Sequence, residues 1–204
     1  MHQYKGKLII HTGSMFSGKT SSLKKDLNRF RIANYKVGAY KPVVDTRGGD
    51  KITIHDESSM DAKCMVDIKE ISKDARNSEY DVIGIDEIQF IGGDKDVVRE
   101  EIESLLNDGI TIVAAGLDMD YNAEAFEIIK ELLPIADYVN KHHAVCTKCG
   151  TDAWVSHRKV SRSERVLIGA ADEYEPLCRS CYQKTVAEEN EEVNKNQIKL
   201  EIAR

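Results

Sequence analysis

The chain has 204 residues, of which 41% are hydrophobic and 31% charged, and its formal net charge at pH 7 is −6. These values are typical of a globular protein with one sizeable core, and the acidic balance argues against a broad nucleic-acid-binding face. No apolar run is long enough to predict a membrane span, and the first ten residues lack the apolar stretch of a signal peptide, so we expect a cytoplasmic protein without a membrane partner.

The first informative segment is the strand-like run KLIIHT (7–12), which leads directly into GSMFSGKT (13–20). A glycine, four residues and then Gly-Lys-Thr match the P-loop pattern at every fixed position. The glycines allow a tight turn whose backbone N–H groups face a polyanion at a helix N-terminus. Lys19 is expected to reach the β- and γ-phosphates, and the Thr20 hydroxyl to ligate Mg²⁺. The expected phosphate site comprises Gly13, Ser14, Met15, Phe16, Ser17, Gly18, Lys19 and Thr20.

The segments that follow alternate between helix-like and strand-like patterns up to about residue 140. Leu23, Leu27 and Phe30 recur at helical spacing, which predicts a helix with one apolar face directly after the P-loop. This alternation implies a mainly parallel sheet with helices on both of its faces, in one α/β domain. Further strands are expected within 35–43, 80–90 and 110–120. Helices are expected over 97–107 and from residue 123 to near Pro134, and a glycine-containing loop followed by extended chain over 45–58.

Two acidic residues, Asp86 and Glu87, directly follow the apolar run VIGI (82–85). Because the carboxyl ends of parallel strands meet at one edge of a sheet, both carboxylates are expected beside the P-loop. Asp86 occupies the place of the acid that supports Mg²⁺ in P-loop proteins. Glu87 would orient a water in an ATPase or take the proton of a substrate hydroxyl in a kinase, unless it is only a solvated charge at the strand end.

Four cysteines dominate the sequence after residue 145, in the pairs Cys146-x-x-Cys149 and Cys178-x-x-Cys181. They supply four thiolates at the spacing of a tetrahedral Zn²⁺ site, although the gap between the pairs is longer than in common zinc ribbons. An all-sulfur set leaves no position for water, so the zinc is expected to be structural. His142 and His143 are alternative ligands, but the sulfur set is complete without them.

These patterns divide the chain into three predicted parts. Residues 1–140 are expected to form the ATP-binding α/β domain, and residues 141–192 a small zinc-binding subdomain. Residues 193–204 are charged and poor in core residues, so they are predicted to form a solvated helix or a frayed tail with no assigned function.

Several motifs together resemble a known family. GSMFSGKT, YKPVVDTR, IGIDEIQF, AAGLDMDY, the two cysteine pairs and LIGAADEYEPLC occur in the order found in the zinc-containing thymidine kinases of the cytosolic, tetrameric type. The resemblance runs from about residue 6 to residue 182. It implies a P-loop, RecA-like fold, transfer of the γ-phosphate of ATP to the 5′-hydroxyl of thymidine or deoxyuridine, feedback inhibition by dTTP, and a homotetramer.

The same resemblance assigns roles to individual residues. Glu87 matches the family's catalytic base, and Arg47 an arginine near the reacting phosphates. Residues 167–174 match a lasso loop whose main chain binds the base and which the zinc module holds. The cofactor-binding set thus also includes Arg47, Asp86 and Gln89, with Thr20 and Asp86 for magnesium. The substrate-binding set comprises Met15, Leu117, Tyr121, Ser156, Leu167, Ile168, Gly169, Ala170 and Tyr174.

Two residues depart from the family pattern, and two other functions share most of the motifs. Tyr121 stands where many members carry Phe, and Ala125 where a proline is commoner, which bears on substrate selectivity but not on phosphate chemistry. A nucleic-acid-stimulated zinc-ribbon ATPase would use the same P-loop, acids and cysteines, but the acidic charge and the absence of an aromatic and basic stripe disfavour it. A non-catalytic nucleotide sensor would require an idle Glu87.

Overall fold

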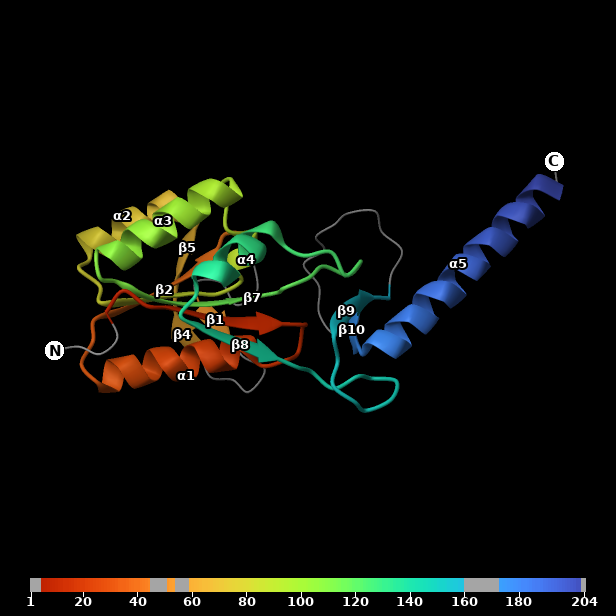
Figure 1. Ribbon diagram of the computed structural model, residues 1–204, viewed down its shortest axis with the longest axis horizontal. Helices are drawn as coiled ribbons and strands as arrows, with labels where there is room; N and C mark the ends of the chain where they lie inside the picture. Colours follow the sequence, from red (N-terminus) through yellow and green to blue (C-terminus); the bar gives the residue numbers. More distant parts are fainter. Residues whose placement is uncertain (1–4, 45–50, 54–58, 160–172, 203–204) are drawn as a thin grey trace.

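Six parallel strands form the central sheet of the computed structural model, which describes residues 5–44, 51–53, 59–159 and 173–202 (Figure 1). Every pairing in this sheet is parallel, as the alternation of elements predicts. The strands, in spatial order, are β5 (Lys63–Met65), β2 (Val37–Pro42), β6 (Val82–Ile85), β7 (Thr111–Gly116), β1 (Leu8–Gly13) and β8 (Tyr138–His142).

Helices cover both faces of the sheet, and each face has its own core (Figure 1). On one face lie α2 (Ile68–Asn77), α3 (Lys95–Asn107) and α4 (Glu127–Leu132), which pack on Leu8 and Ile10 of β1. On the other face α1 (Lys19–Ile32) packs on Ile9, together with the hairpin of β3 (Lys51–Thr53) and β4 (Ser59–Asp61). This alternation of Leu8, Ile9 and Ile10 between faces is the period-two pattern of a strand buried on both sides.

The helix after the P-loop packs as predicted, since Leu23, Leu27 and Phe30 are all buried. A Cβ added at Gly84 in β6 would lie 2.3 Å from Leu27 Cδ1. A side chain at residue 84 would therefore push α1 away from the sheet, and glycine allows the helix to approach β6 closely.

Two predicted elements are shorter than expected. The strand expected within 80–90 covers only Val82–Ile85, and the 3₁₀ helix η1 (Ile88–Phe90) follows it. The helix expected from residue 123 to near Pro134 begins at Glu127 and passes into the 3₁₀ helix η2 (Leu133–Ile135). Its predicted start was wrong because Asp120 Oδ1 accepts hydrogen bonds from the N–H groups of Asn122 and Glu124, which closes a turn instead of a helix.

The described residues after β8 (143–159 and 173–202) form a smaller unit, called the small unit below. β9 (Val155–Arg158) and β10 (Tyr174–Leu177) pair antiparallel, and α5 (Arg179–Ile202) begins beside them and projects away from the sheet (Figure 1). β8 crosses residue 140 and α5 crosses residue 192, and the division of the chain at these two points stays a prediction. Within the described ranges, no helix combines the length and the apolar character that crossing a membrane requires.

The core below α3 offers a test of this packing. Ile102 is fully buried, so Ile102→Ala should lower the free energy of unfolding by about 2–5 kcal/mol, through lost apolar contacts and the cavity left behind. Glu100→Ala, at an exposed position of the same helix, should change it by less than about 0.5 kcal/mol. Urea denaturation of both variants measures the difference, and equal losses would contradict the assigned core.

Candidate functional site

The P-loop turn connects β1 to α1 and depends on two glycines with positive φ. Gly13 has φ 134°, and a Cβ there would lie 2.1 Å from the carbonyl oxygen of His142 in the neighbouring strand β8. Gly18 has φ 83° and stands at the N-cap of α1, where it has no side chain to satisfy the first helical N–H groups. Those N–H groups therefore remain available to an anion.

Polar groups inside this turn fit a phosphate. Lys19 Nζ is buried and donates to the Ser14 carbonyl oxygen at 2.7 Å, so the ammonium lies within the loop. Ser14 Oγ is buried and has no hydrogen-bond partner among the described residues. A buried hydroxyl with unused hydrogen-bonding capacity beside a cation is suited to a phosphate oxygen.

Thr20 and Asp86 are brought together as the sequence predicts. The Thr20 hydroxyl donates to Asp86, with Oγ1 3.1 Å from Oδ1 and 3.2 Å from Oδ2. Burial, together with the adjacent Glu87 carboxylate, raises the pKa of Asp86 to about 7. A divalent cation would favour the ionised form of Asp86, and the Thr20 hydroxyl keeps its oxygen as a possible ligand when its hydrogen is donated to Asp86. This pair therefore fits a Mg²⁺ ligand set.

Glu87 has an unusual backbone and a defined side-chain partner. Its φ of 48° and ψ of 41° lie in the left-handed region, which is uncommon outside glycine and is found at functional sites. Its Oε2 accepts a hydrogen bond from Gln89 Nε2 at 2.6 Å. Gln89 Oε1 in turn accepts from the N–H of Leu117 at 3.1 Å, so these three residues form one hydrogen-bonded chain.

The predicted substrate residues gather in two contacts at the same edge of the sheet. The Met15 N–H in the P-loop donates to Ser156 Oγ of β9 at 2.8 Å. The guanidinium carbon of Arg158 lies 3.8 Å from the ring centroid of Tyr121, and its Nη2 donates to the Tyr174 hydroxyl at 3.1 Å. The small unit is thus joined both to the P-loop and to the segment that follows β7.

Five predicted residues lie outside the described residues, and their roles stay predictions. They are Arg47, Leu167, Ile168, Gly169 and Ala170.

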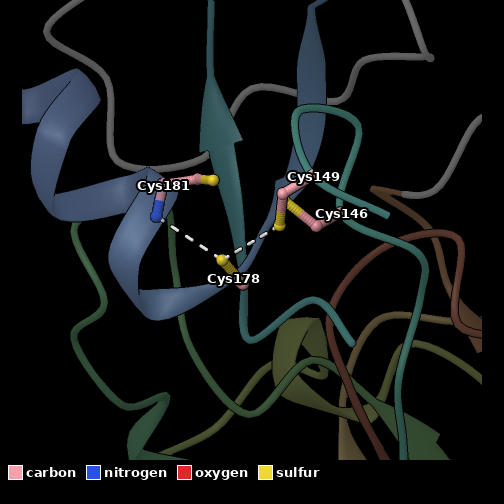
Figure 2. Close-up of side chains that lie close together, drawn as sticks. All are labelled: Cys146, Cys149, Cys178 and Cys181. Carbon is pink, nitrogen blue, oxygen red and sulfur yellow. Dashed lines mark hydrogen bonds between the residues drawn. The ribbon is translucent and has the colours of Figure 1, made fainter. Parts of the chain in front are cut away.

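The four predicted metal ligands form a cluster in the small unit (Figure 2). Their sulfur atoms lie within 4.8 Å of one another, and Cys149 Sγ is 3.6 Å from Cys178 Sγ. Tetrahedral zinc with Zn–S bonds of about 2.3 Å requires sulfur separations of about 3.8 Å, so the cluster fits Zn²⁺. The alternative ligands lie elsewhere, since His142 Nε2 contacts His11 Nδ1 at 2.9 Å and His143 Nδ1 contacts the Ala153 carbonyl oxygen at 3.1 Å.

Electrostatics within the cluster also favour a cation. A hydrogen bond from the Cys181 N–H lowers the pKa of Cys178 to about 6. Hydrogen bonding with Cys178, together with burial, raises the pKa of Cys181 to about 12. Ionisation of one thiol disfavours ionisation of its neighbours, and a dication at the centre of the cluster would favour four thiolates.

Two groups of side chains near the site were missed by sequence reasoning. Arg158 links Tyr121 and Tyr174. Recognition of residues 155–158 as a strand would have indicated it, because Ser156 and Arg158 are two residues apart and therefore lie on the same face of that strand. The second group is His11, in β1 just before the P-loop, whose Nε2 lies 3.1 Å from Asp26 Oδ2. No local pattern in the sequence indicates the contact between His11 and Asp26, because it joins the strand β1 to the face of the helix α1.

Comparison with known proteins gives a consistent family. Residues 6–182 match the family described as "Thymidine kinase". The chain is 40% identical to a thymidine kinase of Bacteroides thetaiotaomicron over 190 residues, 93% of each protein. It is 37% identical to "Thymidine kinase, cytosolic" of Bos taurus over 180 residues, 88% of this chain and 73% of the bovine protein.

Among solved structures, the flagellar accessory protein FlaH of Methanocaldococcus jannaschii is similar with a TM-score of 0.51. The similarity covers 72% of this chain and 75% of FlaH at 14% sequence identity, and it supports the fold alone.

The cysteine cluster predicts one tightly held zinc per chain. Cys178→Ser should lose this zinc and melt at a lower temperature, because a structural zinc contributes on the order of 10 kcal/mol to ordering a small module. Cys64→Ser is the matched control, since Cys64 lies in β5 outside the cluster, and it should keep its zinc. Elemental analysis and thermal melting measure both effects. Wild-type protein without stoichiometric zinc after gentle purification would contradict the assignment.

Proposed function

The chain belongs to the thymidine kinase family, and on that premise we propose that it transfers the γ-phosphate of ATP to the 5′-hydroxyl of thymidine with Glu87 as general base. The observation that carries this proposal is the position of Glu87. It directly follows the Asp86 carboxylate that bonds Thr20 of the P-loop helix, and its own carboxylate has a fixed hydrogen-bond donor. A base beside a phosphate site and held in one orientation suits proton transfer from an acceptor hydroxyl.

We assign the remaining chemistry to the P-loop. The backbone N–H groups of residues 13–20 and the Lys19 ammonium would hold the β- and γ-phosphates of ATP and stabilise charge on the transferring group. Thr20 and Asp86 would hold Mg²⁺, which would offset the negative charge of the phosphates. Glu87 would accept the proton of the 5′-hydroxyl as its oxygen attacks the γ-phosphorus in line with the departing ADP.

The thymine base is proposed to lie between the P-loop and the small unit. Met15, Leu117 and Tyr121 would form its apolar walls, with Ser156 and Tyr174 at the side of β9 and β10. The contacts of Ser156 with Met15 and of Arg158 with Tyr121 support this proposal, because they bring these two parts of the chain together. Leu167, Ile168, Gly169 and Ala170 are proposed to bind the base through their main chain.

Four further properties are proposed from family membership. They are deoxyuridine as a second substrate, dTTP as a feedback inhibitor with its phosphates on the P-loop, assembly into a homotetramer, and a cytosolic location like that named for the bovine relative.

One assay separates the proposed kinase from a nucleic-acid-stimulated ATPase and from a nucleotide sensor. It measures ATP turnover with thymidine, with single-stranded DNA and with neither, and only thymidine should give turnover.

Replacing the proposed base tests the reaction directly. Glu87→Gln keeps the shape of the side chain but removes its basicity, so single-turnover phosphoryl transfer should fall by roughly 10² to 10⁴. Thymidine binding at equilibrium should change little. Near-normal transfer by this variant would remove Glu87 from the mechanism.

Lys19→Ala provides the contrast to this variant. It removes a cation expected at the transferring phosphate, so both ATP affinity and the transfer rate should fall. Titration of ATP binding beside single-turnover transfer distinguishes the two variants. Unchanged ATP affinity in Lys19→Ala would contradict the role given to the P-loop ammonium.

Base choice gives a separate prediction. Main-chain groups that match the O2, N3 and O4 edge of thymine would leave buried partners unmatched against cytosine, which reverses the groups at N3 and C4. Deoxyuridine should therefore be phosphorylated and deoxycytidine hardly at all, as measured by steady-state rates at equal concentrations. Comparable turnover of deoxycytidine would contradict the role proposed for residues 167–174.

A further inference from the structure

Gln89 lies in the 3₁₀ helix η1 and its side chain links two strand ends. The residue is only 7% exposed. Its Nε2 donates to Glu87 Oε2 at 2.6 Å, and its Oε1 accepts from the Leu117 N–H at 3.1 Å. Glu87 follows β6 and Leu117 follows β7, so one carboxamide spans the ends of two neighbouring parallel strands.

The orientation of this carboxamide is determined by its partners. The Leu117 N–H is a donor only, so it requires the carbonyl oxygen of Gln89. The amide nitrogen must then face Glu87, whose ionised carboxylate is an acceptor only. A flipped amide would lose both hydrogen bonds. The backbone of Leu117 therefore fixes the orientation of the Gln89 carboxamide, and the carboxamide in turn orients the Glu87 carboxylate.

The backbone around Gln89 is shaped for this contact. A Cβ added at Gly116, the last residue of β7, would lie 2.5 Å from Gln89 Oε1. Glycine at 116 therefore leaves the space that the carboxamide occupies. The left-handed backbone of Glu87 and the fully buried Ile88 hold the start of this segment, and the Gln89 bond restricts the orientation of the Glu87 carboxylate.

We propose that Gln89 is a positioning residue, which holds the Glu87 carboxylate in the orientation that accepts the substrate proton and ties it to the Leu117 segment. This inference rests on the proposed function of Glu87 as general base. Both polar ends of the Gln89 side chain are engaged inside the protein, which favours this role over direct contact with ATP, the role that family resemblance suggests. The two roles differ in what a substitution should change.

Gln89→Met is the principal variant, because it keeps the length of the side chain and removes both hydrogen bonds. We expect the single-turnover transfer rate to fall by roughly 10- to 100-fold, as for a catalytic group displaced by about 1 Å. The dissociation constants of ATP and thymidine should change by less than about twofold. Gln89→Glu keeps an acceptor for Leu117 but places a second carboxylate against Glu87, and it should lose at least as much rate.

A double-mutant cycle with Glu87→Ala separates positioning from a merely structural role. If Gln89 acts through the Glu87 carboxylate, adding Gln89→Met to Glu87→Ala should cost no further rate. An additive loss, or a rise in the dissociation constant of ATP that accounts for the Gln89→Met defect, would overturn the inference. A Glu87→Ala enzyme that transfers at the wild-type rate would instead overturn the proposed function.

Gly116→Ala provides a second route if Gln89→Met does not fold. The added methyl group should displace Gln89 Oε1, while Gln89 and Glu87 themselves are not substituted. The transfer rate should fall while the affinities for ATP and thymidine are kept, and this loss should also disappear in the Glu87→Ala background. A Gly116→Ala enzyme with the wild-type rate would contradict the proposal.

Discussion

The hydrogen bond between Thr20 and Asp86 is the interaction around which the site is organised. Thr20 lies in the first turn of α1, the helix after β1, whereas Asp86 follows β6, and β7 lies between these two strands in the sheet. The bond therefore crosses the end of β7 and brings the phosphate loop and the acidic pair to one place. Glu87, Gln89 and the start of the segment after β7 take their positions from this arrangement, because each lies within a few residues of one of these strand ends.

Those parts of the fold and the site that depend on local pattern could be predicted from the sequence. The P-loop, the apolar face of α1 and the acids after VIGI follow from spacing and from the rule that parallel strands end at one edge. The cysteine pairs indicated their cluster because metal ligands have characteristic spacings. The start of α4 could not be predicted in this way, since a single side chain, Asp120, closes the preceding turn.

Contacts between elements distant in the sequence were also beyond prediction. Gln89 and Arg158 each join segments from different strands, and nothing adjacent in the sequence records their partners. The helix α2 was not recognised, although Asp67 caps it by accepting from the Glu70 N–H and its buried residues recur at helical spacing. Its first turn directly follows β5, a strand of three residues, so the local signals of two short elements overlap there.

The bond from the Met15 N–H to Ser156 Oγ has a thermodynamic consequence for the whole protein. Met15 belongs to the loop expected to hold phosphates, and Ser156 belongs to the unit that carries the cysteine cluster. A ligand that strengthens or weakens this bond therefore changes the stability of both the phosphate loop and the small unit. By thermodynamic linkage the effect is reciprocal. If phosphate binding shifts the equilibrium between ordered and disordered forms of the small unit by some factor, ordering of that unit changes the phosphate affinity by the same factor.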